Sequence, residues 1–160
     1  MADMDGDGDN DIVGAKGSGS GWIFWIENLG DGVFDDINYY ETTSYPKDIF
    51  LRDIDADSDI DIVYHKDNDL YWYENVGDWT FLSVTLLISN IPSYAGYTVV
   101  KDMNDDGLED VAYVYDAFGD GVDIVKWNEN LGDGSFSDLD TLVIQDLSLI
   151  HISEPTRQEA

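Results

Sequence analysis

The chain has 160 residues, with 35 acidic and 7 basic side chains and a formal net charge of −28. So few cations exclude nucleic-acid binding through phosphate neutralisation and disfavour anionic membranes, while 43% hydrophobic and 13% aromatic residues argue against intrinsic disorder. The lack of cysteine excludes disulfides, zinc–thiolate sites and a cysteine nucleophile, and no apolar stretch has the roughly 18 residues of a transmembrane helix.

Three copies of one unit follow one another along the chain, which points to a repeat architecture. Each copy opens with an acidic loop, and the loops start about 50 residues apart. The loops are residues 3–11, 53–61 and 102–110. The first loop begins directly after Met1 and Ala2, so this end of the sequence does not resemble a signal peptide.

Short β-branched and aromatic runs follow each loop in chain order. The first run leads into a turn, a second run ends in Trp-x-Glu-Asn, and a Gly-Asp turn with an aromatic residue closes the unit. Further runs of this type cover 49–52, 82–88, 98–101 and 139–144. Runs of about four to eight residues rich in Ile, Val, Tyr, Trp and Phe favour strands over helices.

The fold predicted from this organisation is all-β, with propeller blades of four antiparallel strands stacked face to face. The alternative is an ordinary β-sandwich, which does not require three copies of one loop. The blades are expected at 1–48, 49–96 and 97–146. Residues 147–160 do not follow the pattern, and Leu147–Arg157 resembles, residue for residue, a translated sequencing adapter. We therefore expect this tail to be non-native, exposed and outside the third sheet.

The acidic loops have the oxygen pattern of a calcium site. Ca²⁺ takes roughly six to eight oxygen ligands, and alternate residues of a loop that turns sharply midway can converge on one point. We expect side-chain ligands at positions 1, 3, 5 and 9, and a backbone carbonyl at position 7. The candidate ligands are Asp3, Asp5, Asp7, Asp9 and Asp11 in the first loop, Asp53, Asp55, Asp57, Asp59 and Asp61 in the second, and Asp102, Asn104, Asp106, Leu108 and Asp110 in the third, with Asp9, Asp59 and Leu108 acting through the backbone carbonyl. Position 6, where the turn is sharpest, holds Gly8, Ser58 or Gly107.

Other readings of the loops fit less well. An EF-hand needs a bidentate Glu at position 12 and flanking helices, whereas Gly14, Tyr64 and Tyr113 stand there and strands are predicted on the flanks. The Gly-Gly-x-Gly-x-Asp pattern of glycine-rich toxin repeats is absent. A solvated acidic turn remains the simplest alternative, but three loops in register with Asp at position 9 argue against it.

The loops, the strand that follows them and the Glu-Asn-Leu-Gly-Asp-Gly-x-Phe segment resemble FG-GAP/VCBS repeats, the blades of the integrin-α type of β-propeller. The resemblance covers roughly residues 2–146. It implies about three Ca²⁺ sites at the positions named, with weaker binding in the second loop, where Ser58 replaces the usual glycine. Propellers of this family usually have seven blades, so three blades are expected to be part of a longer protein.

No catalytic constellation emerges from the residues. His65 is the only histidine ahead of the tail and is expected at the surface, and no Gly-x-Ser-x-Gly elbow is present. The Glu-Asn pairs before the Gly-Asp turns are expected to hold those turns through side chain to backbone hydrogen bonds. Trp25, Trp72 and Trp127 could form a sugar-stacking platform, but their repeated placement favours a core between blades. Trp22 and Trp79 break the repeat and are better ligand candidates.

The function expected from the sequence is a calcium-binding extracellular or cell-surface module that recognises a protein or carbohydrate, without catalysis, nucleic-acid binding or membrane insertion. The alternative is a propeller within, or attached to, a secreted polysaccharide-degrading enzyme. The residues that would contact the ligand are not specified by the sequence.

Overall fold

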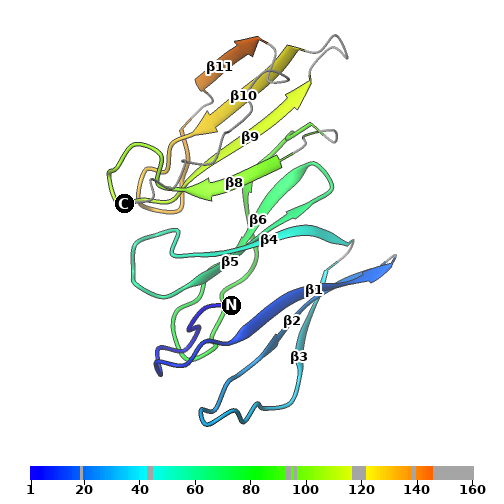
Figure 1. The fold of residues 1–160 in the computed structure, drawn as a ribbon, viewed down its shortest axis with the longest axis vertical. Coiled ribbons are helices and arrows are strands. Elements are labelled where there is room, and N and C mark those ends of the chain that lie inside the picture. The colour runs from blue at the N-terminus through cyan, green and yellow to red at the C-terminus, as the bar shows by residue number, and fades with distance from the viewer. Residues whose placement is uncertain are drawn as a thin grey trace, which may run out of the picture.

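The computed structural model describes residues 1–18, 20–42, 45–92, 95, 97–116, 122–137 and 140–145. Eleven strands make up its regular structure, and this part of the chain contains no helix (Figure 1). The described residues therefore contain no helix that is long and apolar enough to cross a membrane. The strands are β1 Ile12–Ser18, β2 Ser20–Ile26, β3 Asn38–Thr42, β4 Pro46–Arg52, β5 Asp61–Lys66, β6 Asp69–Tyr73, β7 Thr85–Ile88, β8 Tyr97–Lys101, β9 Asp110–Asp116, β10 Val122–Asn128 and β11 Asp140–Gln145.

The strands form three antiparallel sheets, each a meander of strands that are neighbours in sequence. The second sheet has the order β4-β5-β6-β7 and the third β8-β9-β10-β11, so both have the predicted four strands. The first sheet has three strands, β1-β2-β3. The sheets stack face to face (Figure 1), which confirms the prediction of propeller blades, and we refer to them as the first, second and third blades.

Most predicted strands lie where the sequence pattern places them. The runs expected at 49–52, 82–88, 98–101 and 139–144 overlap β4, β7, β8 and β11. β4 begins at Pro46, so the second sheet starts ahead of the boundary expected at residue 49. Residues 147–160, expected to form a non-native tail, lie outside the described residues.

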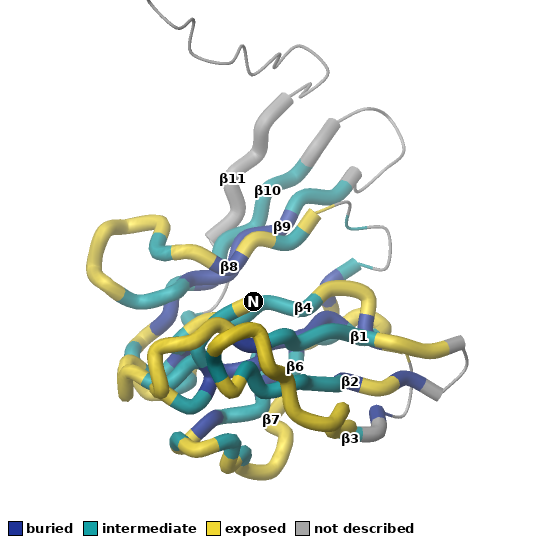
Figure 2. The backbone as a smooth tube through the Cα atoms, turned by 60° about the horizontal axis from the view of Figure 1, so that its bottom comes forward, coloured by how far each residue is buried: buried dark blue, intermediate teal, exposed yellow. Residues whose placement is uncertain are grey.

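Two apolar clusters hold the blades together. Between the first and second blades, Met4 and Ile23 pack with Ile62 and Tyr64. Between the second and third blades, the buried members are Ile54, Val63, Leu70, Trp72, Ile88, Ile91, Val100, Val111 and Tyr113. Figure 2 shows this burial concentrated in the strands, whereas the connecting loops are mostly exposed.

The second residue of the first two acidic loops connects the loop to the next blade. Met4 and Ile54 are 1% and 0% exposed because each packs against strands of the following blade. Met103, at the equivalent place in the third loop, is 51% exposed. In the first two loops an apolar anchor at position 2 therefore stands between carboxylates at positions 1 and 3.

Two expectations about aromatic and histidine side chains have different outcomes. Trp72 is buried in the second cluster, and Trp25 stacks on Trp79 of the second blade, so both belong to the core between blades. The surface placement of His65 is wrong: the residue is 4% exposed because β5 runs between β4 and β6 inside the stack. Burial lowers the pKa of His65 and favours its neutral form.

Candidate metal centre

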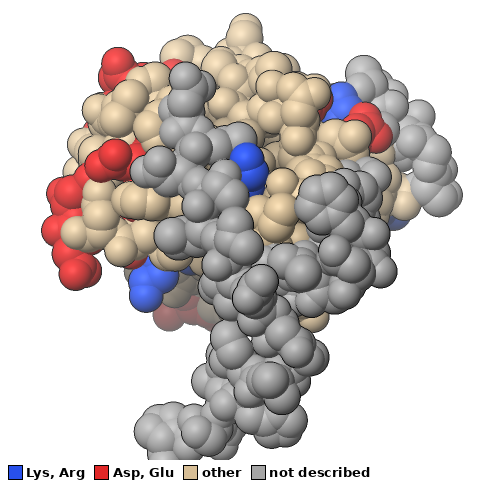
Figure 3. Space-filling view, turned by 90° about the horizontal axis from the view of Figure 1, so that it is seen from above, with Lys and Arg blue, Asp and Glu red and all other residues tan. Residues whose placement is uncertain are grey.

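The three acidic loops lie at one edge of the stacked sheets. The second loop joins β4 to β5 and the third joins β8 to β9, while the first runs into β1 and is closed by a bridge between Ala2 and Asp11. Figure 1 shows all three on the same side of the stack, as the repeat predicts. On the described surface seen in Figure 3, acidic side chains gather toward one side and basic ones are few.

A sharp turn at position 6 shapes each loop. Gly8, Ser58 and Gly107 have φ angles of 99°, 82° and 90°, in the left-handed region that glycine adopts most easily. The backbone N–H of each of these residues donates to the carboxylate at position 1, over 2.9 to 3.0 Å. Asp3, Asp53 and Asp102 thereby fold the loop around their own side chains.

The carboxylate at position 9 is the buried centre of each loop. Asp11, Asp61 and Asp110 are fully buried. Both oxygens accept backbone hydrogen bonds, one from position 2 of the loop and one from the Asn of the Trp-x-Glu-Asn motif, at 2.7 to 3.0 Å. Burial nevertheless raises the pKa of Asp61 to about 7, because the two N–H groups only partly replace the lost water. The pKa of Asp11 is raised for the same reason.

Positions 1, 3 and 9 come together in the first two loops. One oxygen each of Asp3, Asp5 and Asp11 lie within 4.8 Å of one another, and the same holds for the equivalent residues of the second loop, Asp53, Asp55 and Asp61. A carboxylate offers about four acceptor directions, so oxygens that already accept N–H groups keep capacity for a cation.

The second loop contains oxygens that need a partner. The Oδ1 atoms of Asp53 and Asp55 are buried and accept no hydrogen bond from the described residues, and burial raises the pKa of Asp55. Buried carboxylate oxygens without a donor are costly. A hard cation such as Ca²⁺ would satisfy them, so the donor set fits this ion.

The remaining predicted ligands are arranged differently. Asp7, Asp57 and Asp106, at position 5, are exposed and accept the backbone N–H of position 7; they do not join the groups of three. Asp9 is exposed, and Asp59 and Leu108 are half-buried. In the third loop Asn104 donates to Asp106 and Glu129, and within the described chain no three acidic side chains converge there.

A glutamate lies beside each loop, a placement that the sequence pattern does not predict. Burial and the carboxylates of Asp5 and other acids raise the pKa of Glu27, and burial and the acids of the second loop raise that of Glu74. Glu129 accepts a hydrogen bond of 3.1 Å from Asn104. These glutamates therefore border the loops. The signal in the sequence is their recurrence in all three Trp-x-Glu-Asn motifs.

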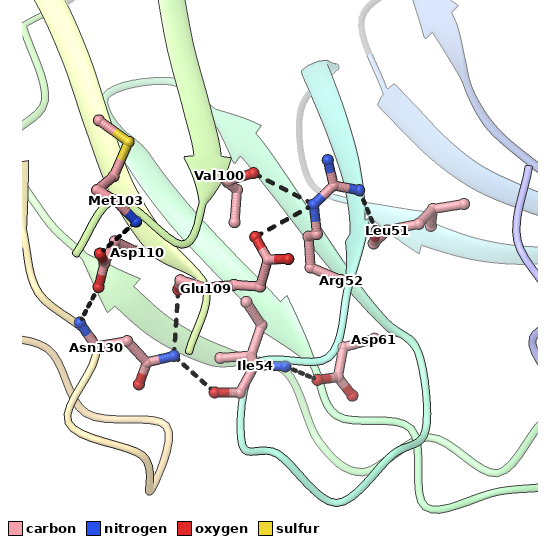
Figure 4. Close-up of polar contacts among 9 residues, drawn as sticks. All are labelled: Leu51, Arg52, Ile54, Asp61, Val100, Met103, Glu109, Asp110 and Asn130. Atoms are coloured by element: carbon pink, nitrogen blue, oxygen red, sulfur yellow. Dashed lines mark hydrogen bonds and ion pairs between the residues drawn. The ribbon is translucent and has the colours of Figure 1, made fainter. Parts of the chain in front are cut away.

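The asparagine after each glutamate organises the loop and the turn together. Its Oδ1 accepts the N–H of the following glycine, at 3.0 to 3.2 Å, which confirms the predicted role in that turn. Its Nδ2 donates to the carbonyl at position 8 of its own loop. In the second and third blades Nδ2 also reaches the preceding blade. Asn75 donates to the carbonyl of Met4, and Asn130 donates to the carbonyl of Ile54 (Figure 4).

An ion pair adds to the junction between the second and third blades. The guanidinium Nε of Arg52 lies 3.4 Å from Glu109 Oε2 and donates to the carbonyl of Val100, at 3.2 Å (Figure 4). Because Glu109 is position 8 of the third loop, β4 of the second blade contacts that loop directly. With the asparagine contacts, each described junction includes an acidic loop.

The two tryptophans that break the repeat have separate surroundings. Trp22 is 36% exposed and lines an apolar hollow of about 240 Å³ with Lys16 and Tyr39. Trp79 is half-buried between the first two blades, where its indole N–H donates to Asp5. Of the two, only Trp22 keeps an open aromatic face in a surface hollow.

The geometry agrees with two comparisons with known proteins. The FG-GAP-like repeat family matches residues 3–64 and 53–113. A solved Agrocybe aegerita lectin, described in terms of specific recognition of non-reducing terminal N-acetylglucosamine, superposes with a TM-score of 0.65 and 26% identity, over 89% of this chain. The chain spans 37% of the length of that lectin. No curated protein matches the sequence significantly.

Proposed function

This chain belongs to the family of FG-GAP-like repeats, and from that premise we propose that it is a Ca²⁺-binding propeller module that recognises a carbohydrate or protein outside the cell. The acidic loops are the cation sites. The stacked blades are the scaffold, and the ligand is bound without catalysis.

The observation that carries the cation proposal is the pair of buried, unpartnered oxygens in the second loop, Asp53 Oδ1 and Asp55 Oδ1. Together with Asp61 they provide three carboxylates within reach of one ion. Asp57 and the backbone carbonyl of Asp59 are the further ligands that we propose for this loop. Bound Ca²⁺ would supply positive charge that offsets the repulsion among these acids.

A thermal melt with Ca²⁺, Mg²⁺ or chelator tests this proposal. Extracellular calcium modules have Kd values on the order of 10⁻⁴–10⁻³ M, so ~10 mM Ca²⁺ would stabilise each site by roughly 1.4–2.7 kcal/mol. Mg²⁺ should substitute poorly because it requires a tighter octahedron. Asp55→Ala should remove the gain from the second loop, whereas Asp59→Ala, which keeps the backbone carbonyl, should retain most of it. Equal melting temperatures with Ca²⁺ and with chelator would contradict the proposal.

For the ligand, we propose a carbohydrate first, because the similar lectin recognises a sugar terminus. Trp22 is the candidate contact, since its half-open ring and the neighbouring Tyr39 offer apolar faces on which a pyranose can stack. Binding of glycans ending in N-acetylglucosamine to the whole chain in Ca²⁺ tests this proposal. Trp22→Ala should abolish binding, whereas Tyr97→Ala, at an aromatic residue that is 79% exposed on β8, should not.

A further inference from the structure

Trp79 joins the first two blades at the first acidic loop. Its indole Nε1 donates a hydrogen bond of 3.2 Å to Oδ2 of Asp5, at position 3 of that loop and 74 residues away. Its ring stacks on Trp25 of the first blade, with centroids 5.8 Å apart and planes 20° apart. One side chain thus contacts both the candidate cation site and the apolar junction between blades.

The backbone of Trp79 is in a region that bulky residues rarely adopt. Its φ is 55°, and the equivalent residues of the first and third blades are glycines, Gly32 and Gly134, with φ angles of 78° and 72°. A tryptophan in this left-handed conformation is strained. Strain of this kind persists where the surrounding contacts compensate for it. For Trp79 these contacts are the hydrogen bond to Asp5 and the stacking on Trp25.

The next junction lacks this contact. Gly134 occupies the equivalent turn between the second and third blades, and a Cβ atom there would come within 2.5 Å of the Trp72 ring, so no side chain fits. Asp55, the counterpart of Asp5 in the second loop, has a buried Oδ1 without a hydrogen-bond partner. Among the described residues, only the first of these two loops has an indole N–H on its position 3 carboxylate, and this difference can be tested.

We propose that Trp79 is a positioning residue for the first acidic loop: its N–H holds Asp5 in the orientation a cation needs, and so makes cation binding and packing of the first two blades interdependent. The inference rests on the proposed calcium function. Because linkage is reciprocal, a cation on Asp5 should strengthen the junction between the blades by the same factor by which the assembled junction strengthens cation binding.

Trp79→Phe in the whole chain is the central test, because phenylalanine keeps an aromatic ring beside Trp25 but has no N–H. Ca²⁺ titrated by calorimetry should bind one site roughly ten- to a hundredfold more weakly, the effect of one hydrogen bond to a carboxylate, with the other sites unchanged. Tb³⁺, a luminescent substitute excited by nearby tryptophan, should lose the part of its sensitised emission from that site that Trp79 supplies, while Trp25, 5.8 Å from Trp79, remains as a second donor. Trp127→Phe, which removes a tryptophan from β10 of the third blade, should leave both the affinity and the terbium signal of the first loop unchanged.

Asp5→Ala separates the two proposals. If Asp5→Ala removes one calcium site but Trp79→Phe binds every site with wild-type affinity, the positioning role is overturned and the calcium function stands. A wild-type chain that binds no Ca²⁺ overturns both.

If Trp79→Phe does not fold, the coupling can still be tested in proteins that keep Trp79, through their tryptophan fluorescence. Ca²⁺ should change the tryptophan fluorescence of the wild type and change it less in Asp5→Ala. An identical change in both proteins would overturn the coupling.

Discussion

The side-chain amide of Asn75 donates a hydrogen bond to the backbone carbonyl of Met4, at 2.8 Å, and so ties the second blade to the first acidic loop. The same amide donates to Ile60 in its own loop, at 3.0 Å. Asn130 repeats the arrangement one blade later, on Ile54. Loop geometry and blade stacking therefore depend on the same side chain.

Asn75→Ala should cost roughly 2–4 kcal/mol, because it leaves the carbonyls that Asn75 serves unpaired in a buried place. Asn28→Ala is the matched control. Asn28 is half-buried, and among the described residues its side chain donates within its own blade alone, to the carbonyl of Asn10, so about 1 kcal/mol is expected. Urea unfolding at constant Ca²⁺ measures both, and equal losses would show that the contact between blades adds nothing.

Ser58→Gly should stabilise the protein by roughly 1 kcal/mol. A non-glycine residue with a φ of 82° is strained by about 1–2 kcal/mol, and the larger loss of chain entropy when glycine folds offsets part of the relief. The N–H that donates to Asp53 is kept. Thermal melts should show the gain. Ser83→Gly, at an exposed serine outside the left-handed region, should give no gain; a comparable rise there would contradict the strain argument.

Calcium binding by the second loop should weaken roughly tenfold from pH 8 to pH 6, because the cation requires ionised Asp61, whose pKa is about 7 in the ion-free protein. Binding should release a proton, which calorimetry in buffers of different ionisation enthalpy can count. Asp61→Asn should release none. A pH-independent affinity would contradict the assignment of Asp61.

The same carboxylate predicts how stability without Ca²⁺ depends on pH. The folded pKa of Asp61 lies above its unfolded value of 3.8, so between about pH 4 and pH 7 the folded state binds more protons than the unfolded state. Its contribution to stability therefore falls as the pH rises through this window. Chelated wild type should lose more stability than Asp61→Asn over that range in urea unfolding.

The contribution of His65 to stability depends on pH in the opposite direction. Its folded pKa lies below its usual 6.5, chiefly because of burial and secondarily because of Lys47, so its contribution is full above pH 6.5 and is lost as the pH falls below it. His65→Leu should cost little at pH 7.5, since Nε2 has no hydrogen-bond partner in the described part of the chain, and should lose less stability than wild type at pH 5. Calcium-saturated urea unfolding measures the difference; parallel pH profiles would contradict it.

The sequence predicts the strands and the loop turns well because both are local. Short apolar runs between turn residues fit strands and are too short for typical helices. The three copies also align Ser58 with Gly8 and Gly107, which predicts the same turn at position 6. The side-chain ligand set is less accessible to such reasoning. Position 5 looks equivalent to positions 1 and 3 in the sequence. In the structure, however, Asp57 is exposed, and its carboxylate accepts the backbone N–H of Asp59 in the same loop.

Contacts between blades could not be read from the sequence. An asparagine repeated three times gives no indication that Asn75 bonds to a loop 71 residues earlier. Trp79 stands out as a break in the repeat, but its partner Asp5 is visible only in three dimensions. His65 follows four other buried residues of β5, and burial of the whole strand was not evident from its polar side chain.

The anchors at position 2 give the stack a direction. Each described junction inserts the loop residue of one blade, Met4 or Ile54, under the blade that follows, and receives an asparagine from that blade in return. Every repeat thus presents the loop residue to the blade that follows it and the asparagine to the blade that precedes it. A duplicated unit would bring both halves with it, so tandem duplication of one such segment within a gene can lengthen the protein without any new interface having to evolve.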